Sequence, residues 1–411
     1  MNESAPTTTV GHDTVQHVRD LPVAERRDDA WRTLAALGEP APTADGLALT
    51  SFAVVKAVLK APDRFSLAKV FEAVETGYPL IPLAFDPPEQ THYRRILQPL
   101  FSPRRIRPLT DALRAQAVDL IEAVKARGGC DFVADIAVPF PAQALLTLLD
   151  MPLADRDRLI AWKDAALQLT ANAAGELVLT DEERAARVDL TMAMAGYLAE
   201  LIQARRTHPG DDMLSEILAL DGEDRFSDEE ATGLCLMLVL AGLETVTDAL
   251  GLAMERLATD PARRRELADD PSLVPAAVEE LLRLDPPAPF LPRITTEDVE
   301  IGGCPIPAGT LVNAHLTTAN RDESCWPHPH DTDFHRPENP HTSFGVGVHR
   351  CLGTHLARLE MQLILEEWHR RISDYAIAEG TPHRARLIRA NIGLESLHLT
   401  FDWSPPPRSA V

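Results

Sequence analysis

The stretch Ser343-Phe-Gly-Val-Gly-Val-His-Arg-Cys-Leu-Gly353 places a single cysteine, Cys351, among three glycines. A free cysteine most often packs as a small hydrophobic residue. Here the glycines permit tight turns and the close approach of a flat ligand, and a helix is predicted to begin directly after the cysteine. The free amides at the start of that helix would lower the thiol pKa and stabilise a thiolate. The stretch therefore predicts a thiolate that could bind a metal.

Two other interpretations of this stretch are less well supported. A dinucleotide-binding loop would need a third glycine where Arg350 stands. A zinc site built from His349, Cys351 and His355 has no evident fourth ligand and leaves the glycines unexplained.

Composition limits the class of protein. The chain has 411 residues with 40 basic and 62 acidic side chains, a net charge of −22, which argues against a general nucleic-acid binder. Its five cysteines lie far apart, so we expect no disulfide framework and a reducing cytoplasm. The N-terminus has no apolar signal core, and the longest apolar-rich run, residues 234–243, is too short to span a bilayer. We therefore expect a cytoplasmic protein that is not bound to a membrane.

Helical periodicity dominates the middle of the chain. It predicts helices over residues 113–124, from the Ser227-Asp-Glu-Glu230 capping box to about Asp260, from Pro275 to about Leu284, and over 352–372. Short strands are expected at 299–301, 311–313 and 397–401. This pattern predicts a mainly α fold with small β-sheets and a long, buried central helix. One domain, 16–405, is expected between flexible tails, 1–15 and 406–411.

The predicted central helix contains Ala241-Gly-Leu-Glu-Thr245. A glycine inside a helix costs about 1 kcal/mol relative to alanine, and an acid among apolar residues costs more. One interpretation is a packing glycine beside a solvent-facing Glu244. The other is that Gly242 lets the helix approach a cofactor, while Thr245 and Ala241 open a groove for a diatomic ligand.

Together these motifs resemble the cytochrome P-450 family. Its haem-ligand loop, F-x-x-G-x-[H or R]-x-C-x-G, is matched by Phe344, Gly347, His349, Cys351 and Gly353. The 241–245 segment is similar to the family's oxygen-binding segment, [A or G]-G-x-[D or E]-T. The stretch 86–90, Asp-Pro-Pro-Glu-Gln, is shared with the camphor-hydroxylating branch. The resemblance implies the cytochrome P-450 fold in a single haem domain.

The resemblance also implies roles for individual residues. Cys351 would be the thiolate ligand of heme b (iron protoporphyrin IX, hereafter haem), Thr245 would assist oxygen activation, and Glu244 would relay protons. The cofactor-binding set implied by the family is Arg94, Arg293, His349, Gln90, Phe344, Gly345, Ala241 and Gly242. Many relatives have histidine where Gln90 stands, so its contact is the least certain. Glu280 and Arg283 match the family's structural E-x-x-R pair.

Substrate contacts are expected from apolar residues on both sides of the groove: Met237, Leu240, Phe290 and Leu291. A polar candidate is Tyr78, since the camphor-hydroxylating branch has a tyrosine at the same distance from its D-P-P-E-Q; such a residue could also be simple packing. A phenol donor in an apolar cage suits a small terpenoid-like substrate with one oxygen acceptor.

Five arginines and no acid lie between residues 94 and 107: Arg94, Arg95, Arg104, Arg105 and Arg107. They could form a solvated helix face, or a basic patch that steers an acidic partner. The family resemblance implies a separate [2Fe-2S] ferredoxin with a ferredoxin reductase. The function implied is O2-dependent hydroxylation. A peroxide-driven peroxygenase and a non-catalytic haem-binding sensor remain as alternatives.

Overall fold

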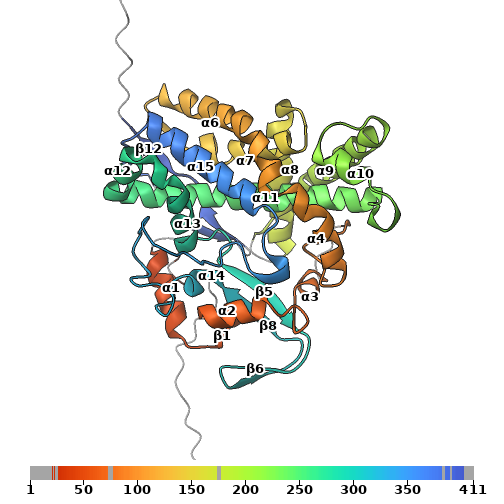
Figure 1. The fold of residues 1–411 in the computed structure, drawn as a ribbon, viewed down its shortest axis with the longest axis horizontal. Coiled ribbons are helices and arrows are strands. Elements are labelled where there is room, and N and C mark those ends of the chain that lie inside the picture. Colours follow the sequence, from red (N-terminus) through yellow and green to blue (C-terminus); the bar gives the residue numbers. More distant parts are fainter. Residues whose placement is uncertain are drawn as a thin grey trace, which may run out of the picture.

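The computed structural model describes Leu21, Val23 and residues 26–72, 77–173, 177–381, 385–388 and 391–401. The predicted tails, 1–15 and 406–411, lie outside these residues. Long helices surround one central helix, and the small sheets lie mostly to one side of it (Figure 1). The mainly α architecture with small sheets is confirmed.

The central helix, α11, runs over Asp228–Thr259 and crosses the molecule in Figure 1. It begins at the predicted capping box: the Ser227 side chain accepts a hydrogen bond from the Glu230 amide, and the Glu230 carboxylate accepts one from the Ser227 amide. The helix is long and apolar enough to cross a membrane, but 67% of its most apolar stretch is buried in the protein. That burial is typical of a core helix.

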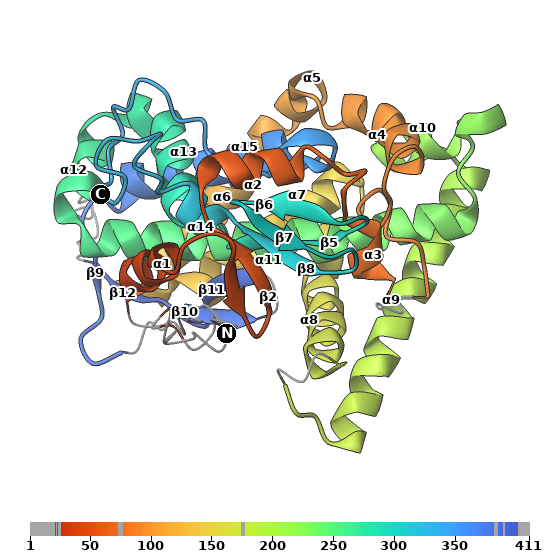
Figure 2. The ribbon, with the colours of Figure 1, turned by 90° about the horizontal axis from the view of Figure 1, so that it is seen from below.

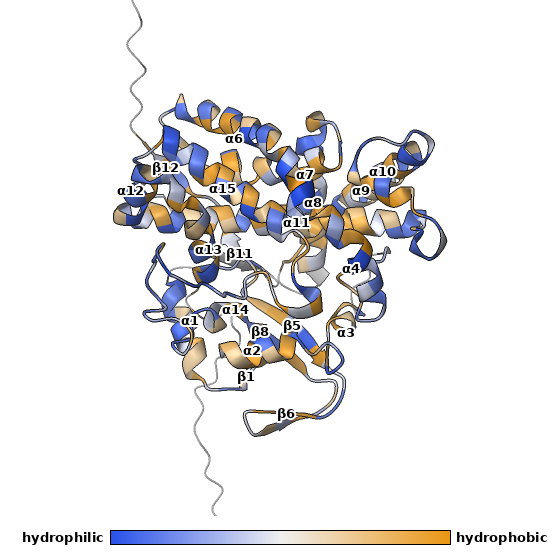
Figure 3. Ribbon diagram, viewed as in Figure 1, coloured by the Kyte–Doolittle hydropathy of each residue, from blue (hydrophilic) through white to orange (hydrophobic). Residues whose placement is uncertain are grey.

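The other helices pack around α11 and frame the cysteine loop. Figure 3 shows blue and orange residues interspersed along α6 and α15, as expected for helices with one buried face. Contacts join α6 to α15, α7 to α11 and α8 to α9. The long helices are α6 (Thr110–Lys125), α7 (Pro139–Leu148), α8 (Arg156–Ala173), α9 (Asp181–Thr207), α13 (Val274–Leu284) and α15 (Thr354–Arg371).

The remaining α-helices complete the shell. In Figure 2, α1 and α2 lie beside the sheets, whereas α8 and α9 extend away from the body of the protein. Their bounds are α1 (Arg27–Ala36), α2 (Phe52–Leu59), α3 (Ala68–Phe71), α4 (Glu89–Leu100), α5 (Pro103–Ile106), α10 (Met213–Leu218), α12 (Pro261–Asp269) and α14 (Leu316–Ala319).

The largest sheet has five strands in the order β1-β2-β8-β5-β3. Its β2–β8 pair is parallel and its other pairs are antiparallel. The strands are β1 (Ala41–Thr43), β2 (Gly46–Leu49), β3 (Phe65–Ser66), β5 (Phe290–Thr295) and β8 (Leu311–His315). Three smaller sheets are formed by β4 (Gly129–Asp131), β6 (Val299–Ile301), β7 (Cys304–Ile306), β9 (Ala376–Ile377), β10 (Ala385–Ile388), β11 (Asn391–Leu394) and β12 (His398–Thr400).

The predicted helices and strands are present, with shifted ends. The helix predicted from Pro275 begins one residue earlier, at Val274, and the helix predicted over 352–372 begins at Thr354. The first residues of that last segment instead complete the loop that presents Cys351. No helix of five or more residues and no strand lies between Asn320 and Gly347, so this described stretch is a long connection.

Candidate functional site

The loop before α15 holds Cys351 by a backbone hydrogen bond. The Cys351 amide donates to the Phe344 carbonyl over 2.8 Å. Gly345 and Gly347 have φ of +66° and +76°, which residues with a side chain rarely adopt. A Cβ on Gly347 would also lie 2.7 Å from the Leu59 carbonyl oxygen, so the loop's path next to α2 requires glycine.

The environment of the Cys351 thiol differs in one respect from the prediction. The Cys351 residue is exposed, yet desolvation by the protein around its sulfur raises the pKa of the thiol. A hydrogen bond from the Gly353 amide, the Thr354 hydroxyl, Arg94 and Arg350 lower it, and the balance is a raised pKa. The start of α15 therefore acts in the predicted direction, but desolvation outweighs it. A cation at the sulfur would reverse the balance, because a metal ion deprotonates a coordinating thiol.

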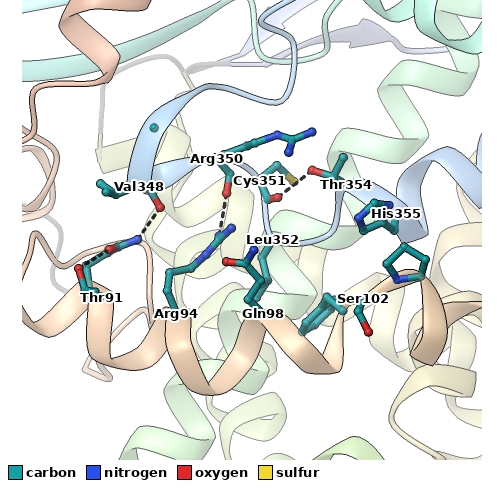
Figure 4. A pocket seen from close by; sticks show the side chains of 14 residues that line it. Thr91, Arg94, Gln98, Ser102, Val348, Arg350, Cys351, Leu352, Thr354 and His355 are labelled. Atoms are coloured by element: carbon teal, nitrogen blue, oxygen red, sulfur yellow. Dashed lines mark hydrogen bonds between the residues drawn. The ribbon is translucent and has the colours of Figure 1, made fainter.

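One face of the loop rests on α4, and a cavity of about 410 Å³ lies between them (Figure 4). The Gln90 amide donates to the Val348 carbonyl over 2.6 Å, and the Arg94 guanidinium donates to the Arg350 carbonyl over 2.7 Å. Both side chains thus fix the carbonyls on either side of His349. Cys351 borders the same cavity.

His349 is held by Asp86, which lies just before α4. Its Nε2 lies 3.2 Å from the Asp86 carboxylate, which also accepts hydrogen bonds from the Ser66 hydroxyl and the Leu67 amide. Burial raises the pKa of Asp86, but the His349, Ser66 and Leu67 bonds outweigh it, so the carboxylate stays ionised. The sequence reasoning missed Asp86 as a support of this histidine, although it opens the quoted D-P-P-E-Q.

Arg293 on β5 is a buried cation with little compensation. It is 2% exposed, and its guanidinium donates to the neighbouring Pro292 carbonyl over 2.7 Å. No carboxylate of the described residues forms an ion pair with it, and burial lowers its pKa to about 10, although the Asp86 charge opposes this in part. A buried guanidinium in this state fits an anionic ligand group that would complete its pairing.

In α11 the residues predicted to form the groove are linked by a side-chain hydrogen bond. The Thr245 hydroxyl donates to the Ala241 carbonyl over 2.7 Å, so this carbonyl is shared between the helix and a side chain. A Cβ added to Gly242 would meet no atom within 4 Å, although the glycine lies midway along a core helix. This face of the helix therefore opens onto free space.

Glu244 is not solvent-facing. It is 7% exposed and forms an ion pair with Lys163 of α8, which is 4% exposed. Lys163 also contacts Asp164 at 2.6 Å. Burial lowers the Lys163 pKa, but the two carboxylates outweigh it and raise the pKa overall. Sequence reasoning missed Lys163; the only signal was a lysine inside the apolar run of α8.

Of the apolar residues predicted to contact the substrate, Phe290 lies on a different face of β5 from Leu291. Met237 and Leu240 are half-buried on α11, in the two turns before the groove. On β5, Leu291 shares a face with Arg293 and lies beside the cysteine loop, since a Cβ on Gly345 would be 3.5 Å from its Cδ1. Phe290 points to the opposite face and packs against His315, with ring centroids 5.2 Å apart.

Tyr78 is half-buried and packs against the main core. The next residue, Pro79, touches α11 so closely that a Cβ on Gly233 would lie 2.0 Å from its carbonyl oxygen. Gly233 is one helical turn before Met237. The segment that carries Tyr78 therefore lies against the same helix as Met237 and Leu240, two turns from the Ala241–Thr245 groove.

The five arginines of residues 94–107 do not form one uniform patch. Arg95 pairs with Asp224, and Arg105 pairs with Glu216 at 2.6 Å. Arg104 and Arg107 are exposed and carry no ion pair with another described residue. Among the described residues, the positive charge without a carboxylate partner thus lies on Arg94, Arg104 and Arg107, and the cavity is lined by Arg94 and by Pro103, the neighbour of Arg104.

Glu280 and Arg283 form the expected structural pair. The Arg283 side chain donates twice to the Glu280 carboxylate, over 2.7 and 2.8 Å, and both residues are buried. Arg336 and Asn339 also donate to Glu280, and Arg283 reaches the carbonyls of Asn320 and Pro329. The pair therefore ties α13 to the long connection that leads to Cys351.

Comparison with known proteins identifies the family. A sequence model described as Cytochrome P450 matches residues 179–371. A vitamin D(3) 25-hydroxylase from Pseudonocardia autotrophica is 35% identical over 80% of this chain and 78% of its own. The chain belongs to the cytochrome P450 family.

Other P450 proteins agree over almost the full length. A steroid C26-monooxygenase from Mycobacterium tuberculosis is 32% identical over 88% of this chain and 96% of its own. The open structure of the P450 Eryk from S. erythraea is 30% identical over 94% and 99% of the two chains, with a TM-score of 0.82. The protein is thus an oxidoreductase of the monooxygenase type, and P450 proteins bind thiolate-ligated heme b.

Two observations fit this chain to haem. Haem is flat, and the open space at Gly242 leaves one face of α11 free for a flat group. Haem also carries two propionates, and Arg293 is a buried cation without an ion-pair partner among the described residues.

Proposed function

We propose that this P450 inserts one oxygen atom of O2 into a C–H bond of a small apolar, terpenoid-like substrate. The balanced reaction is R–H + O2 + two electrons + two protons giving R–OH + H2O. We propose further that the electrons come from a separate [2Fe-2S] ferredoxin with its reductase, and that the reaction takes place in the cytoplasm. The observation that carries the proposal is the buried Glu244 next to Thr245, because this reaction needs protons at a water-poor site.

The cofactor contacts are assigned as follows. Cys351 is the thiolate ligand, held by the Phe344 carbonyl, and Arg293 binds a propionate. Arg94, His349 and Gln90 are further propionate candidates, although each already has a protein partner in the loop or in Asp86. Haem supplies the oxygen chemistry, which a thiolate ligand favours by pushing electron density to the iron.

Protons reach the site through Glu244. In the present geometry its carboxylate is paired with Lys163, so it must exchange this partner, or rotate, before it can serve the groove. Thr245 then presents a hydroxyl beside the groove, with its oxygen held 2.7 Å from the Ala241 carbonyl. The peroxygenase and sensor alternatives have no need of this acid–alcohol pair.

The substrate class rests on apolar residues and one phenol. Met237, Leu240 and Leu291 are the apolar contacts that we retain, whereas Phe290 faces the other side of β5 and supports the pocket only indirectly. Tyr78 is the proposed hydrogen-bond donor, as in the camphor-hydroxylating branch. The named substrates of two relatives, vitamin D(3) and a steroid, are likewise largely apolar isoprenoid-type molecules.

A spectral screen tests this substrate class. Terpenoids and sterols with one oxygen acceptor should shift the haem spin state of the purified protein, and small aromatics without such an acceptor should not. Tyr78→Phe should weaken binding by about 1 kcal/mol, roughly fivefold in Kd, and loosen regioselectivity. Tyr93→Phe is the matched control, since this half-buried hydroxyl bonds Glu230 instead. An unchanged product distribution and affinity in Tyr78→Phe would remove Tyr78 from the pocket.

A further inference from the structure

A clamp formed by Arg358 and Glu279 lies directly behind the cysteine loop. Arg358 is on α15, one turn after Thr354, and Glu279 is on α13. The guanidinium forms two parallel contacts with the carboxylate, of 2.5 Å from Nε and 2.6 Å from Nη2. This bidentate geometry fixes the plane of the guanidinium.

The clamp holds Phe344 through its ring. The Cζ atom of Arg358 lies 4.5 Å from the centroid of the Phe344 ring, within cation–π distance. His341 contacts both groups, with its Nε2 3.1 Å from the second Glu279 oxygen and its ring centroid 6.0 Å from that of Phe344. The phenyl ring is therefore bounded by groups that are themselves fixed on Glu279.

Phe344 connects this clamp to Cys351, because its carbonyl accepts the Cys351 amide over 2.8 Å. A continuous path of contacts thus runs from the Glu279 carboxylate through Arg358 and the Phe344 ring to the cysteine backbone. Glu279 is well suited to anchor it. Burial raises its pKa, but Arg358 and His341 outweigh that effect and lower the pKa to about 2.

We propose that Arg358 is a positioning residue for the thiolate ligand: held by Glu279 and stacked on Phe344, it keeps the loop in the form that presents Cys351 to the haem iron. The inference rests on the proposed role of Cys351. The ordinary alternative is that the ion pair only joins α13 to α15. If Arg358 positions the loop, its loss should weaken thiolate ligation even when proteins of equal global stability are compared. If it only joins the two helices, ligation should change no more than global stability does.

The experiment compares Arg358→Ala and Arg358→Lys with Arg371→Ala in the purified holoenzyme. Arg371 is the matched control: it lies on the same helix and also forms carboxylate pairs, with Glu122 and Glu367, but it does not touch the loop. The readouts are the global unfolding midpoint and the rate at which the ferrous carbon monoxide complex loses its thiolate-type, red-shifted band in mild urea.

At urea concentrations equally far below each unfolding midpoint, Arg358→Ala should lose the band about fivefold to tenfold faster than wild type, in line with the strength of one partly exposed cation–π contact. Arg358→Lys keeps the charge but not the planar stacking, so its rate of band loss should lie between those of wild type and Arg358→Ala. The rate of Arg371→Ala should match that of wild type. Equal rates for Arg358→Ala and Arg371→Ala would overturn the inference. Should Arg358→Ala fail to fold, Arg358→Lys and Glu279→Gln carry the same comparison.

A double-mutant cycle gives an independent readout. If Arg358 acts through the Phe344 ring, the effects of Arg358→Ala and Phe344→Leu on the rate of band loss should be clearly less than additive. Additive effects would contradict the proposed path. A wild-type protein that lacks the red-shifted band from the start would instead refute the role of Cys351, so the two failures are distinguishable.

Discussion

The Glu244 carboxylate on α11 is buried against the Lys163 ammonium on α8, a residue 81 positions earlier in the chain. Removing one member of a buried ion pair leaves an uncompensated charge, which typically costs about 3–5 kcal/mol. Lys163→Met should therefore lower the free energy of unfolding by about 3 kcal/mol. The double variant Lys163→Met/Glu244→Leu should recover most of this loss. Urea unfolding of the three proteins measures both values; a double variant no more stable than Lys163→Met would show that the pair is not energetically coupled.

Thr245→Ala should uncouple the reaction. Without the hydroxyl that bonds the Ala241 carbonyl, the groove loses its polar partner for bound oxygen and for protons from Glu244. Reducing equivalents should then appear as hydrogen peroxide in place of product. Thr245→Ser keeps the hydroxyl and is the control. The measurement is the ratio of product to electrons consumed, and unaffected coupling in Thr245→Ala would count against this mechanism.

Arg104 should contribute to ferredoxin docking because its charge is not compensated by a described carboxylate. Arg104→Gln should slow second-order reduction by an acidic ferredoxin by roughly threefold at low salt and reduce the salt dependence of that rate. The control is Arg105→Gln/Glu216→Gln, which removes a pair that is already neutral and leaves the net field nearly unchanged. A reduction rate with unaltered salt dependence in Arg104→Gln would refute docking at this patch.

The stability that Glu279 contributes should be lost in acid. Its pKa is lowered from 4.5 to about 2, so its pairing with Arg358 contributes fully above about pH 4.5 and is lost as the pH falls towards 2. Over this interval the stability difference between wild type and Glu279→Gln should shrink by roughly 3 kcal/mol. Urea unfolding at pH 7, 4 and 2.5, at about equal ionic strength, measures it. A constant difference would show that the carboxylate is not held ionised.

Motifs formed by residues close together in the sequence predicted the main elements of the fold. The Ser227 capping box placed the start of α11, and the loop before α15 was recognised from the spacing of its glycines and Cys351. Such features are visible in sequence because each depends on residues only a few positions apart.

Long-range relationships were harder to predict. Lys163 and Glu244 meet only through the packing of α8 on α11, so the burial of Glu244 was one of two open interpretations. Phe290 and Leu291 were grouped by composition, but the strand period of two sends them to opposite faces of β5. The ion pairs within the arginine patch were not predicted either. Asp224 and Glu216, which neutralise two of its members, come more than 100 residues later in the chain.

The central claim is that Cys351 ligates the haem iron as a thiolate. The most direct measurement is the absorption spectrum of the dithionite-reduced protein under carbon monoxide, with Cys351→Ser as the comparison. Thiolate ligation predicts the strongly red-shifted band in the wild type and its loss in Cys351→Ser. Cys304→Ser, which changes an exposed cysteine on β7, should keep the band. A wild-type spectrum without that band, or one that survives in Cys351→Ser, would contradict thiolate ligation by Cys351.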